Sequence, residues 1–408
     1  MGIANADEHR VMLRKEKNKT EVELKSAFEI NKRIEVSGMA KLFLGKYGVM
    51  FLSFIMTIYL FGDLAIYSTT VPKSLMNVIC DSSRSTVVKN TDPCYGSWPE
   101  WLTRIAVYRL SVAAFTLFVT PLVIIGVTRT KYMQIATSVC RWSAFIIMIV
   151  LACVRFGQHG ALIPKAASIH GFGSLFGTTV YAFMCHHSLP SLVTPMKSKK
   201  KFSFWLMLVY GVIFGFYFFL SFTGTLAFKE LFDVYPLNFL HDNEHKGVGF
   251  QIIFYFLALF PVFTLTSNYP IVANTLVNNF MVLLDIIYEL QVPEDESPEK
   301  TLPHRERIRY MTIGIVIAIA TTIALCTDNV LILATITGSY PGVGVQYIIP
   351  ALLVVFGRRY THQQLSTDVP SNVRSPFHQN IWAYMMFVWS GVTIIMTTLN
   401  LCKVFNKI

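Results

Sequence analysis

The sequence predicts an all-α polytopic membrane protein, and three observations support this class. Of the 408 residues, 53% are hydrophobic and only 14% are charged, whereas soluble domains carry roughly 25% charged residues. Several apolar stretches approach the ~20 residues that cross a bilayer as a helix. The basic residues behind the formal net charge of +11 cluster at the ends of these stretches. This pattern is typical of cytoplasmic loops, so we expect a lipid bilayer as the partner and no nucleic acid.

The apolar runs predict nine membrane segments. They span about 48–71, 104–127, 134–156, 169–192, 203–228, 248–273, 308–328, 330–356 and 379–402. Residues 1–47 are polar and are predicted to form a cytoplasmic tail, and 403–408 a short luminal or extracellular tail. The transmembrane domain is therefore expected over 48–402.

The distribution of lysine and arginine predicts the orientation. If the segments alternate, the lysine-rich stretch 197–201 and the arginine pair 358–359 fall on the same side as the N-terminal tail and the charged loop 285–309. The loops on the other side are poorer in lysine and arginine, so the basic side is expected to be cytoplasmic. No targeting signal is evident, which leaves the plasma membrane and a lysosomal or other internal membrane as alternatives.

Two of the seven cysteines are predicted to form a disulfide. Cys80 and Cys94 lie in one polar loop, whereas the other five lie in or beside apolar runs and are expected to be small hydrophobic residues. A disulfide needs an oxidising compartment, and the predicted orientation places this loop on the luminal or extracellular side.

The stretch HGFGSLFGTTVYAFMCHHSLPSL (170–192) is apolar enough to enter a bilayer but contains glycines and a proline that weaken a helix. One interpretation is a discontinuous helix, unwound near Gly177–Phe183, whose backbone groups bind a substrate or an ion. The alternative is close helix packing through small residues such as Gly173. The spacing alone does not decide between them.

Two further features are candidates for ion coupling. Asp63 is an acid within a membrane segment, where it is a candidate proton carrier or a partner of an arginine, or else forms a structural hydrogen bond with a neighbouring helix. Thr264, Thr266 and Ser267 lie together in another segment beside Pro270, where their hydroxyl groups suit Na⁺. The alternative is that these hydroxyls bond the backbone around a proline.

The sequence gives no support for a metal site or for enzyme chemistry. His186 and His187 are adjacent, so they cannot bind one ion from one face of a helix, and no carboxylate or cysteine set has ligand spacing. The HExxH, GxSxG and P-loop patterns do not occur. We therefore expect no cofactor, no metal and no enzymatic activity.

Several stretches resemble the amino acid/auxin permease family of secondary transporters, and within it the transmembrane protein 104 branch. The resemblance covers nearly the whole chain from about residue 28. It is carried by FEINKRIEVSGMAKLFLGKYG (28–48), YLFGDLAIYSTTVPKSL (59–75), YAFMCHHSLPSLVTP (181–195), LFPVFTLTSNYPI (259–271), ITGSYPGVGVQYIIPALLV (336–354) and RSPF (374–377).

The resemblance implies a broken-helix fold of eleven helices, two inverted repeats of five plus one, with the substrate held between unwound first and sixth helices. The segment 169–192 matches the sixth helix, and the expected substrate-binding residues are Gly177, Thr178, Thr179, Phe183 and His186. The segment 260–276 matches the eighth helix, which supplies cation ligands in sodium-coupled relatives. Residues 28–48 match the stretch that follows the second helix, so we expect nine helices here, with the first two missing.

Together these observations predict a secondary active transporter of amino acids or related small solutes that works by alternating access. The expected coupling ion is H⁺ or Na⁺. The alternative is a membrane protein that does not transport: a scaffold, a sensor or a truncated isoform that lacks half of the substrate site.

Overall fold

A computed structural model gives the fold of this chain. It describes residues 1–7, 28–30, 32, 34–80, 91–95, 98–99, 101–126, 131–162, 172–186, 188–194, 196, 199, 201–229, 231–240, 247–291, 304–365, 369, 375 and 377–402. The predicted tail 403–408 lies outside these ranges, as do residues 8–27, 31 and 33 of the predicted tail 1–47.

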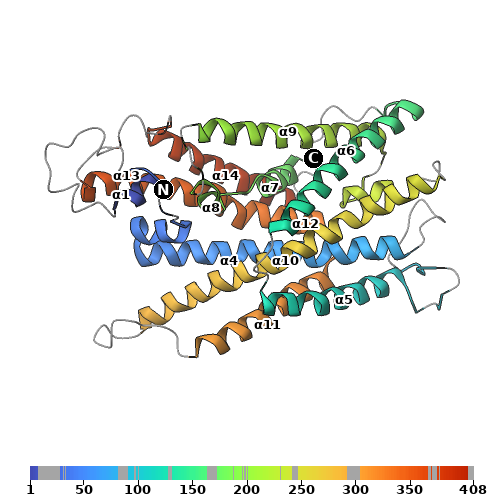
Figure 1. Cartoon of the computed structure of the whole chain (residues 1–408), viewed down its shortest axis with the longest axis horizontal. Helices are drawn as coiled ribbons and strands as arrows, with labels where there is room; N and C mark the ends of the chain where they lie inside the picture. Colours follow the sequence, from blue (N-terminus) through green and yellow to red (C-terminus); the bar gives the residue numbers. More distant parts are fainter. Residues whose placement is uncertain are drawn as a thin grey trace.

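Eight helices in the described ranges are long and apolar enough to cross a bilayer. They are α4 (Val36–Ile79), α5 (Arg104–Ile125), α6 (Lys131–His159), α9 (Phe202–Ala227), α10 (Val248–Gln291), α11 (Arg305–Cys326), the continuous run from α12 (Val330–Thr337) to η4 (Thr361–Leu365), and α14 (Ile381–Leu401). Figure 1 shows them lying roughly along the long axis of the molecule, with most connections at its two ends. The predicted class, an all-α polytopic membrane protein, is confirmed.

The ninth predicted segment, 169–192, is not one continuous helix. It is divided between α7 (Phe172–Ala182) and α8 (Leu189–Val193), and neither is long enough to cross a bilayer alone. Of the nine predicted spanning segments, eight correspond to continuous membrane-length helices and one is interrupted, in the part of the chain that the structure describes.

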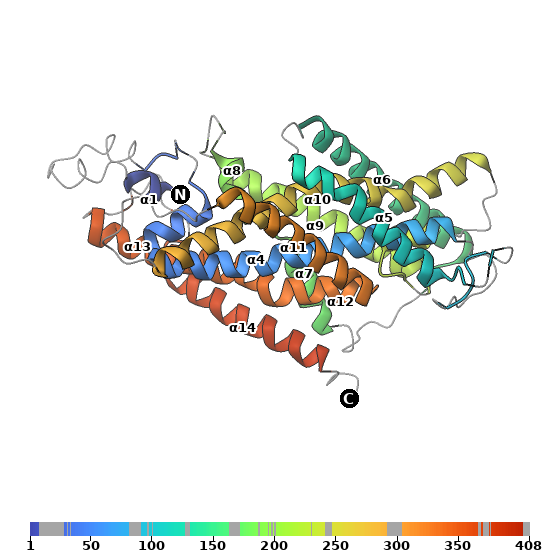
Figure 2. The same ribbon diagram turned by 90° about the horizontal axis from the view of Figure 1, so that it is seen from below.

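Helix α4 is the central element of the bundle. In its most apolar stretch 61% of the residues are buried, compared with 6% in α9, which lies at the periphery. Helices α4 and α10 run antiparallel and cross near the middle of the molecule (Figures 1 and 2). Leu60 and Leu64 of α4 and Leu276 of α10 belong to one buried cluster there, to which α5 and α11 also contribute.

Two helices extend beyond their predicted ends. Helix α4 continues past residue 71 through Pro72, and its membrane part is separated from a preceding helical stretch by a kink at Gly45, where φ is 69°. Helix α10 continues from residue 273 to Gln291 because Leu276, Val277 and Met281 pack into the α4 cluster. The prediction ended early because Asn274, Asn278 and Asn279 lower the hydropathy there, although the residues between and after them are buried in this cluster.

The run from Val330 to Leu365 contains turns wider than those of an α-helix. Segments η2 (Gly338–Gly342) and η3 (Gly344–Ile348) are π-helical, and α13 (Ile349–Tyr360) continues from them. This run contains three glycines, Gly338, Gly342 and Gly344, together with Pro341, all of which weaken a regular α-helix. The structure accommodates them as π turns, which are common at functional positions in helices.

Candidate functional site

The interruption between α7 and α8 is the first feature of the candidate site. The described chain is non-helical from Phe183 to Ser188, and Pro190 lies in the first turn of α8, where a missing N–H is tolerated. The predicted position of the unwound stretch, Gly177–Phe183, is wrong because the chain is helical from Phe172 to Ala182. The break therefore begins six residues later than expected, at Phe183 in place of Gly177.

Tyr210 of α9 binds the backbone released at this break. Its hydroxyl donates to the Phe183 carbonyl oxygen at 3.2 Å and lies 2.8 Å from the Cys185 Sγ atom. The Tyr210 and Phe183 rings also stack, with centroids 6.0 Å apart. A carbonyl group without a partner is costly in a membrane, so this tyrosine stabilises the non-helical conformation.

The glycines of α7 allow close packing against neighbouring helices. This is the alternative interpretation of the glycines in the sequence. A Cβ atom at Gly177 would collide with the Ser339 hydroxyl and lie 2.5 Å from the Thr335 carbonyl oxygen, and one at Gly338 would collide with the Gly177 carbonyl oxygen. Gly173 approaches α14 in the same way, where a Cβ atom would lie 2.7 Å from the Met396 carbonyl oxygen. Helix α7 is therefore in backbone contact with two neighbours, and the break follows directly after this packed part.

Asp63 of α4 lies beside the last turn of α7. Asp63 is 7% exposed, and the hydroxyl groups of Tyr59 and Tyr181 lie close enough to interact with its carboxyl group, whose Oδ1 atom is buried and has no hydrogen-bond partner among the described residues. The preceding residue, Gly62, permits close approach of α4 to α12, since a Cβ atom there would collide with Thr337. Tyr181 comes from α7, two residues before Phe183. The structure thus links the intramembrane acid to the helix that contains the break.

The five predicted substrate-binding residues do not face one common space. Gly177 packs against η2, Thr178 donates back to the Ser174 carbonyl oxygen at 2.9 Å, and Phe183 lies against Tyr210. The other two are the exposed Thr179, which lines a shallow cavity beside α14, and the half-buried His186 in the break. Their role in binding stays a prediction.

The hydroxyl groups of α10 bond mainly to their own helix. Thr264 donates to the Phe260 carbonyl oxygen at 2.9 Å, and Ser267 donates to the Thr264 carbonyl oxygen at 2.9 Å. The Thr266 hydroxyl is buried and has no hydrogen-bond partner among the described residues. This is the arrangement that the alternative interpretation, backbone bonding near a proline, predicts for Thr264 and Ser267.

Asp63 and these hydroxyls are at different depths. Ser68 of α4 contacts Tyr269 of α10, and the two helices run antiparallel. Asp63 and Thr264 lie five residues from this contact in opposite directions, which separates them by roughly 15 Å along the helix axes at ~1.5 Å per residue. The two sets of predicted ion-coupling residues therefore do not form one site.

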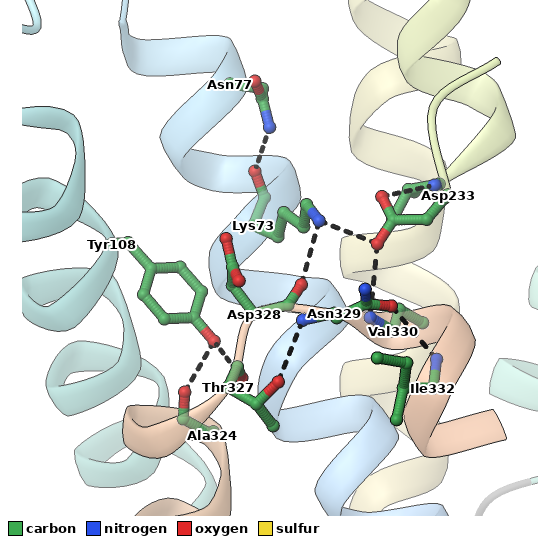
Figure 3. Close-up of polar contacts among 11 residues, drawn as sticks. Lys73, Asn77, Tyr108, Asp233, Ala324, Thr327, Asp328, Asn329, Val330 and Ile332 are labelled. Atoms are coloured by element: carbon green, nitrogen blue, oxygen red, sulfur yellow. Dashed lines mark hydrogen bonds and ion pairs between the residues drawn. The ribbon is translucent and has the colours of Figure 1, made fainter. Parts of the chain in front are cut away.

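A polar cluster that the sequence did not predict lies at the C-terminal end of α4 (Figure 3). Lys73 Nζ is 2.7 Å from Asp233 Oδ2 and donates to the Asp328 carbonyl oxygen at 2.9 Å. The Asp233 carboxylate also accepts from the backbone N–H groups of Val330 and Val234, at 3.2 and 3.0 Å. We call this cluster the Lys73 junction. It joins α4, the α9–α10 connection and the start of α12.

Neighbouring contacts extend the Lys73 junction. The Tyr108 hydroxyl donates to the Ala324 carbonyl oxygen at 2.8 Å, and Asn329 caps α12 by accepting from the Ile332 N–H at 3.0 Å (Figure 3). In the α9–α10 connection, burial raises the pKa of Tyr235 to about 12. A lysine at the end of an apolar run is typical of snorkelling at the membrane surface, which is why sequence patterns did not single out Lys73.

The predicted disulfide between Cys80 and Cys94 is present. It joins the end of α4 to the connection before α5, where Arg104 donates to Asn77 Oδ1 at 2.8 Å. The disulfide and the Lys73 junction therefore lie at the same end of α4, the end that the charge pattern predicts to be luminal or extracellular.

Comparison with known proteins supplies the family. The sequence model for the family described as transmembrane amino acid transporter protein matches residues 29–398. The transmembrane protein 104 homolog of Caenorhabditis briggsae is 48% identical over 398 residues, which cover 93% of this chain and 81% of that protein. Human transmembrane protein 104 is 40% identical over 394 residues, 92% of this chain and 74% of that protein. The homolog of Dictyostelium discoideum is 32% identical over 389 residues, 91% and 72% of the two chains. This chain therefore belongs to the transmembrane amino acid transporter family, in the branch of the transmembrane protein 104 relatives.

Proposed function

We propose that this chain is a secondary active transporter of amino acids or related small solutes, that it works by alternating access, and that its coupling ion is a proton. The observation that carries the proposal is the contact between Asp63 of α4 and Tyr181, two residues before the break that begins at Phe183. Membership of the transmembrane amino acid transporter family supports the solute class.

The proposed roles follow from this arrangement. The backbone at the break and His186 bind the solute, since non-helical backbone within a membrane protein offers N–H and C=O groups to a ligand. Asp63 carries the proton, because a buried carboxyl group with tyrosine hydroxyls around it can exist with or without its proton. Tyr181 connects the two, so that protonation of Asp63 changes the hydrogen bonding of the last turn of α7.

A proton is favoured over Na⁺ by the geometry of α10. Two of its three predicted sodium ligands, Thr264 and Ser267, donate to backbone carbonyl oxygens, and Thr264 is far from Asp63 along the helix axes. A sodium site at these hydroxyls would lack the nearby carboxylate. Asp63 would then have no part in coupling.

The experiment is uptake by the purified chain in proteoliposomes, with a panel of amino acids and with imposed pH or sodium gradients. We expect accumulation driven by the pH gradient, and loss of that accumulation in Asp63→Asn. The matched control is Glu289→Gln, which removes an exposed acid of α10 that pairs with Lys46 and should leave uptake unchanged. Absence of uptake for the whole panel under both gradients would overturn the proposal and favour the non-transporting alternative.

A further inference from the structure

A cavity of about 660 Å³ lies at the end of the molecule opposite the Lys73 junction. It is formed where α1 (Gly2–Asp7) meets the first part of α4, the end of α13 and the chain before α14, and Figure 1 shows α1, α13 and the beginning of α4 together at this end. We call it the α13 cavity. This end is the one that the charge pattern predicts to be cytoplasmic.

The walls of the α13 cavity change from apolar to cationic along α13. Leu353 and Val354 line one part of it, and Arg358 and Arg359 line the part nearer the end of the helix. Five residues of helix separate these pairs, a distance of about 7.5 Å along the axis. An amphiphile with an apolar tail and an anionic head at this spacing matches both parts of the wall.

The opposite wall continues the apolar surface. Met39 and Phe43, from the helical stretch of α4 that precedes the Gly45 kink, also line the cavity. The α13 cavity therefore lies at the ends of membrane helices, at the depth where lipid headgroups begin.

The charge of the α13 cavity is positive. Its lining in the described ranges includes two arginines and two histidines, His362 and His378, and contains no aspartate or glutamate. Asp7 of α1 lies nearby but accepts a hydrogen bond from the Tyr360 hydroxyl. An anion that enters the cavity therefore meets cationic and hydrogen-bond-donating groups without a competing carboxylate in the described lining.

The two arginines are held differently. Arg358 is fixed by donating to Asn380 Oδ1 at 2.8 Å and to the Phe377 carbonyl oxygen at 2.7 Å. Arg359 is exposed, and its guanidinium lies 5.4 Å from the centroid of the Phe356 ring, with no carboxylate against it among the described residues. A planar guanidinium with unused donors is the group that most favours a phosphate oxygen pair.

We propose that the α13 cavity binds an anionic phospholipid, with the phosphate of the headgroup at Arg358 and Arg359 and the acyl chains against Leu353, Val354 and Phe43. Anionic lipids are concentrated in the cytoplasmic leaflet, which is the leaflet that the predicted orientation places at this cavity. The site is separate from the break between α7 and α8, so the proposal does not depend on transport.

The test is a lipid titration of the purified full chain in nonionic detergent, followed by native mass spectrometry. The probes are phosphatidylserine, phosphatidylcholine with the same acyl chains, and inorganic phosphate. We expect one phosphatidylserine to bind more tightly than phosphatidylcholine. Arg359→Gln should weaken phosphatidylserine binding about fivefold, the effect of one basic residue at an anionic membrane surface, and Arg359→Lys should weaken it less.

The matched control is Arg307→Gln, which removes an exposed arginine of α11 that does not line the cavity. It should leave phosphatidylserine binding unchanged. Equal weakening by Arg307→Gln and Arg359→Gln would overturn the proposal in favour of non-specific attraction. Equal binding of the two lipids would also overturn it, as would displacement of phosphatidylserine by inorganic phosphate at similar concentration, which would indicate a soluble anion as the ligand.

Discussion

The Lys73 junction gives the sharpest prediction because its geometry distinguishes a bonded network from a simple ion pair. The side chains of Lys73 and Asp233 are 15% and 17% exposed. Exposed ion pairs contribute about 0–1 kcal/mol, and removing one partner of a buried pair costs about 3–5 kcal/mol. We therefore expect Lys73→Met to lower the free energy of unfolding by about 2–3 kcal/mol, between these limits.

The charge-swapped double variant, Lys73→Asp with Asp233→Lys, should be no more stable than Lys73→Asp alone or Asp233→Lys alone. Asp233 accepts from two backbone N–H groups, and Lys73 donates to the Asp328 carbonyl oxygen. After the exchange, an ammonium would face backbone donors and a carboxylate would face a carbonyl oxygen. Both contacts are repulsive, although the net attraction between the two side chains is unchanged in sign.

The assay is unfolding of the purified chain in mixed micelles by increasing SDS, followed by tryptophan fluorescence. Lys46→Met is the matched control, because the pair of Lys46 with Glu289 has a similar distance, 3.0 Å, but side chains that are 51% and 41% exposed. It should change stability by less than about 1 kcal/mol. Recovery of wild-type stability by the charge-swapped variant would refute the reasoning, since it would show that attraction between the two charges is sufficient.

Three further substitutions test other contacts in the same unfolding assay. Gly177→Ala should destabilise the chain by about 1–3 kcal/mol because its methyl group collides with η2. The control Gly211→Ala in α9 should not destabilise it, because no atom lies within 4 Å of the added Cβ. Equal effects of the two substitutions would contradict the packing argument. Joint replacement of Cys80 and Cys94 by serine should cost about 3 kcal/mol, the value for a loop near 15 residues, and an unchanged midpoint would argue against a structural role. Tyr108→Phe should cost about 1–2 kcal/mol, since the Ala324 carbonyl oxygen loses its buried donor, and no loss would mean that water replaces the hydroxyl.

Most of the fold could be predicted because hydropathy reports directly on membrane insertion. The span of α9 was predicted to within a residue at each end, since its sequence is apolar on all sides and bounded by lysines. The second half of α10 was not predicted. Its buried residues pack into the cluster that α4, α5 and α11 share, and an average hydropathy does not separate them from the asparagines that lie between them in the sequence.

The site was less predictable because it depends on which helices are neighbours. The sequence marked the glycines of α7 and Asp63 separately, but no local pattern relates Asp63 to Tyr181, which lies more than a hundred residues away. The break at Phe183 was placed too early because Gly177 has low helix propensity in water. In the structure this glycine stays helical because its backbone packs directly against η2.

The backbone contact between Gly177 and Gly338 also determines which relative movement of α7 and η2 is easy. Where side chains of one helix insert between those of the next, an axial shift would force them out of their rotamers. At this contact no side chain of either glycine interlocks, and the wide turns of η2 leave its hydrogen-bonding register able to move by one residue. We therefore expect α7 to translate along η2 as a rigid piece, with the bending confined to the chain between Phe183 and Ser188.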